Sequence, residues 1–364
     1  MLNGYEISLL LSALVALSCG GNAVDVGHSQ NRGWADAPAN DTSASDASAA
    51  APQIIYENEH AIFGFALDET TVYALIDHGA TFELVSCPIE HCRSQRKVLL
   101  RSPKLGEEGA DLTPLVLTGG WLYWMVANGG PSGIAGCPAT GCAQAQFLPS
   151  TFRSLLVGDA DGAYWIDDDK SLLRITPSAE APELLRELDD ELVEARHLLA
   201  RGDYMYFSLG DVVSTIRRVR KDGTDPSELV ATDEEISGLA VTSDAIYYST
   251  QILTGRIAEC QLVGCQTGAS TLAANQRWPK ETQVDGNEAF WLSSSTFSDR
   301  VAYATLSSCE LPDCVSVMQR ANDVPVDNIT DQYSRGPTFA VSQQAVVWLA
   351  RYGTFGTSFW KSPR

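Results

Sequence analysis

One short segment recurs seven times along this chain of 364 residues, and each copy is built on one or two aromatic side chains. The clearest copy is Leu122-Tyr123-Trp124-Met125, and we call this segment the aromatic tetrad. The seven tetrads begin at Val72, Leu122, Ala163, Met205, Ile246, Ala289 and Val346, so that neighbouring copies start 41–57 residues apart. A self-similar period of this length is typical of repeat architectures, in which each repeat is one supersecondary unit.

Apolar segments and turns surround each tetrad in a constant order. A short strand such as 62–67 comes first, a turn and the tetrad follow, and third and fourth strands such as 132–136 and 146–148 complete the repeat. Alternation along a strand places the Tyr and Trp of a tetrad on opposite faces. Four short antiparallel strands per repeat form a propeller blade, so we predict an all-β fold, a seven-bladed β-propeller of four-stranded antiparallel blades. Residues 182–196 show apolar positions at helical spacing, and we expect a loop or a single helical turn there.

The two ends of the repeat array predict how the ring closes. The seventh repeat ends at Arg364 after three strands, with Pro363 placed like Pro88 and Pro138. Residues 53–56 form a strand that has no blade before it. We expect this N-terminal strand to complete the last blade, because closure removes sheet edges that would otherwise pair with other chains. Ile54 and Tyr56 are expected to face one side of the strand, and Ile55 the other.

Nine cysteines divide into four pairs of identical spacing and one that stands alone, Cys19. Each pair brackets the predicted turn between the third and fourth strands of a repeat, where two cysteines lie close enough for a disulfide. A thiolate metal site is the alternative, but the turns of four different blades cannot converge on one ion. We therefore expect four disulfides and no metal site. The pairs are Cys87/Cys92, Cys137/Cys142, Cys260/Cys265 and Cys309/Cys314.

The N-terminus carries an export signal. Residues 7–17 form an apolar run that is too short to span a bilayer but has the length of a signal-peptide core. The following Ala16-Leu17-Ser18-Cys19 resembles the lipobox of bacterial lipoproteins, in which the cysteine is acylated. We expect a signal peptide at residues 1–18, a lipidated flexible tether at 19–52 and the propeller at 53–364. This places the protein in the bacterial cell envelope, anchored to a membrane on the periplasmic or the cell-surface side.

The net charge of −21 argues against nucleic acid as a partner, because nucleic-acid binding requires a basic surface. The expected partners are the membrane, through the lipid anchor, and another envelope protein, a glycan or a small ligand.

Candidate ligand-binding residues come from the predicted loops between second and third strands, which open around the central channel of a propeller. Asp167-Asp168-Asp169 is the most acidic of these loops, and we expect it to attract a cation or a basic partner. The equivalent loops contribute Asp77, His78, Asp211, Asp299, Arg351 and Tyr352. The five histidines form no metal-binding motif, and no phosphate-binding or nucleophile-elbow motif is present, so no cofactor is expected.

One tetrad carries a resemblance to a known class of propeller. Tyr164-Trp165-Ile166-Asp167 resembles the Tyr-Trp-Thr-Asp segment of propellers in low-density-lipoprotein-receptor-type proteins. The resemblance concerns residues 53–364 and implies the fold, not an activity. The sequence favours a lipid-anchored extracytoplasmic binding or scaffolding propeller. The alternative is an envelope hydrolase or lyase with a site at the mouth of the channel, which converging carboxylate, His and Arg side chains with shifted pKa values would favour.

Overall fold

The computed structural model describes residues 52–364 except 59, 104–111, 127–131, 153–155, 189–194, 211–212, 251–253, 266–267, 299–300, 327–338 and 353–355. These residues form 28 β-strands and one short 3₁₀ helix, η1 (Ile89–His91). None of the helical structure in the described residues is long enough to cross a membrane.

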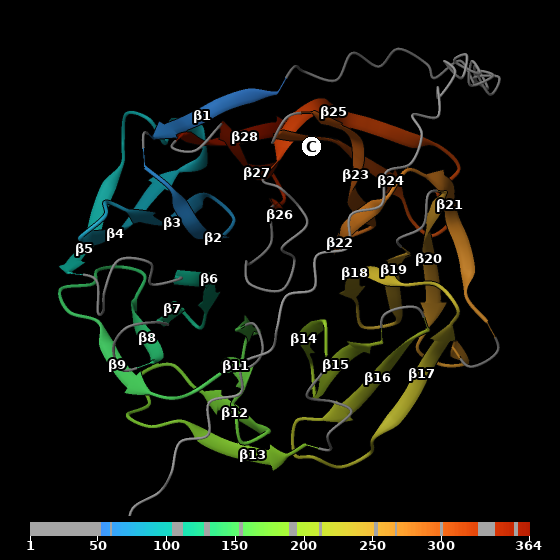
Figure 1. Ribbon diagram of the computed structural model, residues 1–364, viewed down its shortest axis with the longest axis horizontal. Helices are drawn as coiled ribbons and strands as arrows, with labels where there is room; N and C mark the ends of the chain where they lie inside the picture. Colours follow the sequence, from blue (N-terminus) through green and yellow to red (C-terminus); the bar gives the residue numbers. More distant parts are fainter. Residues whose placement is uncertain are drawn as a thin grey trace, which may run out of the picture. The chain divides into compact units, whose positions relative to one another are not determined.

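The strands form seven sheets of four antiparallel strands, arranged as a ring (Figure 1). We number the sheets as blades 1–7 in chain order, and the innermost strand of each blade is its first. Blades 1–3 consist of β2 (Ile62–Leu67), β3 (Thr71–Asp77), β4 (Thr81–Pro88) and β5 (Lys97–Pro103); β6 (Leu112–Thr118), β7 (Trp121–Val126), β8 (Gly133–Pro138) and β9 (Gln146–Pro149); and β10 (Val157–Gly158), β11 (Ala163–Ile166), β12 (Ser171–Ile175) and β13 (Glu183–Glu187).

Blades 4–7 repeat the same order. They consist of β14 (His197–Arg201), β15 (Tyr204–Leu209), β16 (Ser214–Arg220) and β17 (Ser227–Thr232); β18 (Ile236–Val241), β19 (Ala245–Thr250), β20 (Gly255–Gln261) and β21 (Ser270–Gln276); β22 (Pro279–Asp285), β23 (Glu288–Ser298), β24 (Val301–Glu310) and β25 (Val317–Val326); and β26 (Phe339–Val341), β27 (Ala345–Tyr352), β28 (Gly356–Pro363) and β1 (Gln53–Asn58).

The aromatic tetrad lies in the second strand of every blade, and its alternation fills the joints between blades. Trp165 of blade 3 packs backward against Tyr123 and Met125 of blade 2, while Tyr164 packs forward against blade 4. The third-position tryptophans Trp124, Trp165, Trp291 and Trp348 are all fully buried. Each tetrad therefore stabilises two joints of the ring, which explains why this segment recurs so regularly.

The N-terminal strand closes the ring as predicted. β1 pairs with β28, so that Gln53 lies opposite Lys361, Ile54 opposite Trp360 and Tyr56 opposite Phe359. The expected alternation along β1 is wrong, because Ile55 forms a β-bulge between the last two pairs. The bulge buries Ile55 and Tyr56 together and leaves the side chain of Ile54 44% exposed.

A second expectation is also corrected. The segment 182–196 is not a loop or a helical turn throughout, because β13 (Glu183–Glu187) is the outer strand of blade 3 and pairs with β12. Its residues are half-buried or exposed, so the strand lacks the apolar alternation that reveals the other strands.

The four predicted disulfides are confirmed: Cys87–Cys92, Cys137–Cys142, Cys260–Cys265 and Cys309–Cys314 are all bonded. These turns are parts of the blade joints. Cys137 and Cys142 of blade 2 pack against Tyr73 of blade 1, and Cys260 and Cys265 of blade 5 pack against Tyr206 of blade 4.

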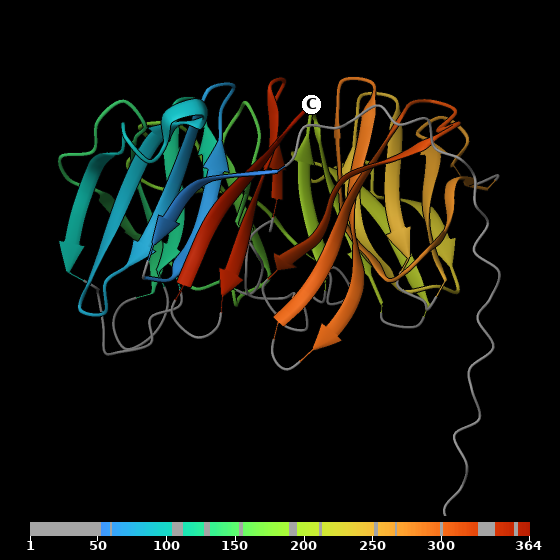
Figure 2. The same cartoon turned by 90° about the horizontal axis from the view of Figure 1, so that it is seen from above.

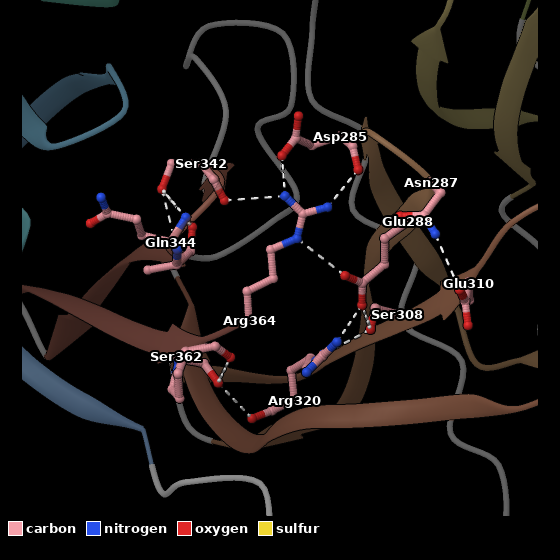
Figure 3. Close-up of polar contacts among 12 residues, drawn as sticks. Asp285, Asn287, Glu288, Ser308, Glu310, Arg320, Ser342, Gln344, Ser362 and Arg364 are labelled. Atoms are coloured by element: carbon pink, nitrogen blue, oxygen red, sulfur yellow. Dashed lines mark hydrogen bonds and ion pairs between the residues drawn. The ribbon is translucent and has the colours of Figure 1, made fainter.

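Blades 4 and 7 lack this disulfide. In each of them a basic side chain directly follows the third strand, at the turn where blades 1, 2, 5 and 6 carry the disulfide. Lys221 follows β16 and pairs with Asp159 and Asp161 of blade 3, and its ammonium nitrogen lies 4.9 Å from the centre of the Tyr164 ring. Arg364 follows β28 and contacts the turn at Asp285 of blade 6 (Figure 3). Its Nε donates to Glu288 over 3.2 Å. Disulfide turns and ionic contacts thus close equivalent joints.

Candidate functional site

The ring has two faces, which the chain direction distinguishes. The turns between first and second strands and between third and fourth strands lie on one face, which we call the turn face. The connections between second and third strands, and the starts of the first strands, lie on the other, which we call the loop face. In the side view of Figure 2 the end of the chain is at the top, on the turn face.

Asp77 and His78 lie in the loop after β3 of blade 1, on the loop face. The Asp77 carboxylate accepts a hydrogen bond from the amide of Gly79 over 2.8 Å, which shapes the turn. His78 Nε2 lies 3.3 Å from a carboxylate oxygen of the buried Glu83. Burial alone raises the pKa of Glu83, but the hydrogen bond from Arg101 and the charge of Arg96 lower it below its usual value. This carboxylate is therefore an anion held by its own blade.

The loop Asp167-Asp168-Asp169 lies on the loop face of blade 3, and the structure divides it into two kinds of residue. The half-buried Asp167 accepts a hydrogen bond from the amide of Ser171 over 2.7 Å, which closes the turn. Asp168 and Asp169 are exposed, and the Asp168 amide donates to Thr151 over 3.2 Å. The two exposed carboxylates are the part of this loop that faces solvent. Blade 2 separates them from Asp77 and His78.

The remaining candidates lie wholly or partly outside the described residues. Asp211 and Asp299 fall in two of the gaps. Arg351 and Tyr352 end β27, which places their backbone at the loop face, but their side chains are outside the described part of the chain.

A polar cluster that the sequence did not reveal lies where the inner strands of blades 4–6 begin. His197 opens β14, and its Nδ1 lies 2.6 Å from the hydroxyl of the buried Ser208. Burial lowers the pKa of His197 to about 4, the charge of Arg196 acts in the same direction, and a hydrogen bond to the backbone of Ser237 opposes them. The imidazole is therefore neutral at pH 7 and joins blade 4 to blade 5.

Charged side chains from blades 4, 5 and 6 extend this cluster. Arg196 donates to Glu235, which precedes β18 of blade 5. Lys280 lies in β22 of blade 6 and is buried, which lowers the pKa of its ammonium group, whereas the charges of Glu281 and Glu235 oppose the shift. Charged groups from blades 4, 5 and 6 thus lie near one another where the inner strands begin.

The backbone has strand irregularities and a positive φ angle near the starts of β18 and β22. β18 and β22 each contain an irregularity near their start, at Ser237 and at Glu281. Glu281 has a φ of 45°, which is costly for a residue with a side chain. A side chain at Gly238 would meet the amide of Thr282 at 2.6 Å, so the glycine is what lets the two inner strands approach. Strain and bulges of this kind are frequent at functional sites.

The chemistry of the cluster favours binding over nucleophilic catalysis. Ser208 is only 1% exposed, so its contact with His197 does not present a nucleophile to a substrate. Arg196 is paired with Glu235, and Arg256 with Glu234. Among the residues that the structure describes, no group of three or more His, Cys, Asp or Glu side chains is arranged to hold a metal ion.

The sequence contains a weak signal for this cluster. Ile236-Ser237-Gly238 repeats the pattern of Ile62-Phe63-Gly64 in blade 1, where β2 has the same irregularity and Gly64 approaches Leu115 of blade 2 equally closely. The repeat of Ile-x-Gly at the start of an inner strand marks a close contact between neighbouring blades.

Comparisons with known proteins show the fold and no family. No protein-family model matches the chain, and no curated protein sequence matches it. An oligogalacturonate lyase in complex with manganese is similar in structure, with a TM-score of 0.60, 11% identity, and coverage of 88% of this chain and 95% of that one. YCF48 bound to a D1 peptide gives a TM-score of 0.60 at 11% identity, over 86% of this chain and 96% of the other. A prolyl endopeptidase gives 0.57 at 10% identity, over 81% of this chain and 46% of the other. At these identities the likeness concerns the β-propeller fold alone.

Proposed function

We propose that this protein is a lipid-anchored, extracytoplasmic binding propeller that holds a basic segment of another envelope protein on its loop face. The observation that carries the proposal is a set of solvent-exposed acidic residues on that face, Asp168, Asp169 and Asp233. Acidic residues that face solvent attract a cationic partner.

The net charge of the chain supports this assignment. At −21 the protein attracts cationic partners over a distance that salt screening shortens, so binding is expected to weaken as the ionic strength rises. Propellers of this fold include one solved with a bound peptide, which supports the use of such a ring for peptide binding.

The test compares two variants that change the net charge equally. Asp168, Asp169 and Asp233 are replaced by Asn on the loop face, and Glu69→Gln, Asp244→Asn and Asp313→Asn are made on the turn face, where these three residues are exposed. An oligolysine peptide is the probe, and its affinity is measured by fluorescence anisotropy at two salt concentrations. The loop-face variant should bind about tenfold more weakly and with a smaller salt dependence, and the turn-face variant should bind like the wild type. Equal weakening in both variants would show that only the net charge matters.

The anchor has its own test. Radiolabelled palmitate should enter the wild-type protein in bacterial cells and should not enter the Cys19→Ala variant. Label retained by the variant would contradict acylation at Cys19.

A hydrolase or lyase with its site at the channel mouth is the second candidate, and one observation favours it. Burial lowers the pKa of both His197 and Lys280, and shifted pKa values are common at catalytic sites. Turnover of chromogenic glycosides, esters or uronate oligomers by the wild type, lost in Lys280→Met with the fold intact by circular dichroism, would support an enzyme.

A further inference from the structure

The turn face carries two apolar side chains that project almost completely into solvent. Val263 is 94% exposed and Val315 is 93% exposed, the highest values among the exposed large apolar residues of the described chain. Val263 lies in the turn after β20 of blade 5, and Val315 in the turn after β24 of blade 6. The two valines therefore occupy equivalent turns of neighbouring blades.

A disulfide and a backbone hydrogen bond hold each turn. Val263 lies within the loop that the Cys260–Cys265 disulfide closes, and Val315 directly follows Cys314 of the Cys309–Cys314 disulfide. The amide of Leu262 donates to the Asp244 carbonyl over 2.8 Å, and that of Leu311 donates to the Asn287 carbonyl over 2.7 Å. In the corresponding turns of blades 1 and 2, Glu90 and Thr140 take the place of Val263, and Arg93 and Ala143 take the place of Val315. Among the four disulfide turns, the two exposed valines thus belong to blades 5 and 6.

Further exposed apolar side chains lie in the outer strands, toward the ends that start at the turn face. Val317 and Met318 open β25 of blade 6 and are 38% and 40% exposed. Ile54 of blade 7 is 44% exposed, Val98 of blade 1 is 42% exposed and Leu184 of blade 3 is 55% exposed. We call Ile54, Val98, Leu184, Val263, Val315, Val317 and Met318 the apolar rim.

The chain enters the ring at this same rim. Gln53 begins β1 opposite Lys361, near the end of β28 on the turn face, and 33 residues (20–52) separate this point from Cys19. Even fully extended, a segment of that length spans only about 110 Å. A lipid on Cys19 therefore keeps the apolar rim near the bilayer, and a tether raises the local concentration of the surface that it joins.

We propose that the apolar rim docks on the membrane, with Val263 and Val315 inserted among the lipid headgroups and acyl chains. Val263 and Val315 lie on projecting turns, which can insert into a deformable bilayer. A peptide segment or a second folded copy would need a complementary groove to bind. The neighbouring Glu310 and Asp313 are acidic, so the attraction is apolar and not electrostatic. This inference extends the proposed function, on which it rests for the nearness of the membrane. The docked ring presents its loop face away from the bilayer, where a partner can reach it.

The experiment uses the chain without residues 1–18 and with Cys19→Ser, so that docking is measured without the lipid. Co-sedimentation with phosphatidylcholine vesicles gives the partition coefficient. Val263→Ser with Val315→Ser should lower it about a hundredfold, because burying each valine side chain changes a partition coefficient by roughly tenfold. The control, Val213→Ser, removes an apolar side chain that is 65% exposed and directly precedes β16 on the loop face, so it should leave partitioning unchanged.

A second readout tests the depth of insertion. The tryptophan of Val263→Trp should be quenched by brominated phosphatidylcholine, and that of Val213→Trp should not. Equal partition coefficients for the double variant and Val213→Ser, or equal quenching, would overturn the proposal. So would a rise in partitioning after deletion of residues 22–50, since that segment would then be the occupant of the rim. Because Cys19 is not acylated in these samples, failure of the anchor and failure of docking are distinguishable.

Discussion

The ammonium nitrogen of Lys221 lies 2.9 Å from the carboxylate of Asp161, and this contact crosses from blade 4 to blade 3. Lys221 also pairs with Asp159, and the side chains of Lys221 and Asp159 are only 9% and 11% exposed. Burial alone lowers the pKa of Lys221, but the hydrogen bonds to Asp159, Tyr164 and Asp161 raise it above its usual value. The charge is therefore retained at the joint.

Removal of this cation should destabilise the ring. Lys221→Met leaves the buried Asp159 without its cation, and we expect the free energy of unfolding to fall by about 3 kcal/mol. The neighbouring Arg220 provides the control, because its partners Asp203 and Asp222 are exposed. Arg220→Met should cost less than about 1 kcal/mol. Urea denaturation of the two variants measures both values, and similar losses would show that the Lys221 contact is not special.

The half-buried His197 predicts a pH dependence of stability. Its pKa in the folded protein is about 4, below the value of 6.5 for an exposed imidazole. The unfolded chain therefore binds the proton first as the pH falls, so the stabilising effect is complete above pH 6.5 and is lost as the pH decreases toward 4. Between pH 7 and pH 5 this group should lower the free energy of unfolding by about 2 kcal/mol.

Two glutamine variants isolate that effect. His197→Gln should flatten the decrease between pH 7 and pH 5, whereas His91→Gln, at an exposed position, should retain it. The measurement is the slope of unfolding free energy against pH, which does not depend on the stability of each variant at neutral pH. An unchanged slope in His197→Gln would contradict the burial of a neutral imidazole.

The fold could be predicted because its determinants are local. Each tetrad, turn and cysteine pair is a short segment, and their period fixes the number of blades. Residues 183–187 were missed because an outer strand buries only part of its surface, so its pairing with β12 decides its conformation more than its own pattern does. The Ile55 bulge depends on the partner strand β28, which lies three hundred residues away along the chain.

The candidate site could be predicted only in part, for a different physical reason. The position of the loops at Asp77 and Asp167, between the second and third strands of a repeat, can be predicted because it follows from the order of the strands. The cluster of His197, Glu235 and Lys280 comes from three inner strands that only the closed ring brings together. Each of these residues looks unremarkable in its own segment.

The disulfides predict a stability effect that is distributed around the ring. Replacing Cys137 and Cys142 by Ala should lower the free energy of unfolding by about 2 kcal/mol, since the bond closes a short loop. The same change at Cys260 and Cys265 should cost about as much, and the two losses should add because blades 2 and 5 share no joint. Guanidinium denaturation of the two double variants and their combination measures this. A combined loss well below the sum would show that the two joints are coupled.

The bulge in β1 makes neighbouring isoleucines unequal, and this predicts the final pair of variants. Ile55 is 7% exposed and packs in the core between blades 7 and 1 with Tyr56 and Phe359, whereas Ile54 is 44% exposed. Ile55→Ala should therefore lower the free energy of unfolding by about 2–4 kcal/mol, because it opens a cavity at the closing joint. Ile54→Ala removes the same atoms from a partly solvated site and should cost less than about 1 kcal/mol. If strict alternation along β1 held instead, Ile54 and Tyr56 would share one environment and Ile54→Ala would resemble Tyr56→Ala in its cost. Thermal and urea denaturation of the two isoleucine variants decides between these arrangements, because a larger loss for Ile54→Ala would contradict the bulged register of the strand that closes the ring.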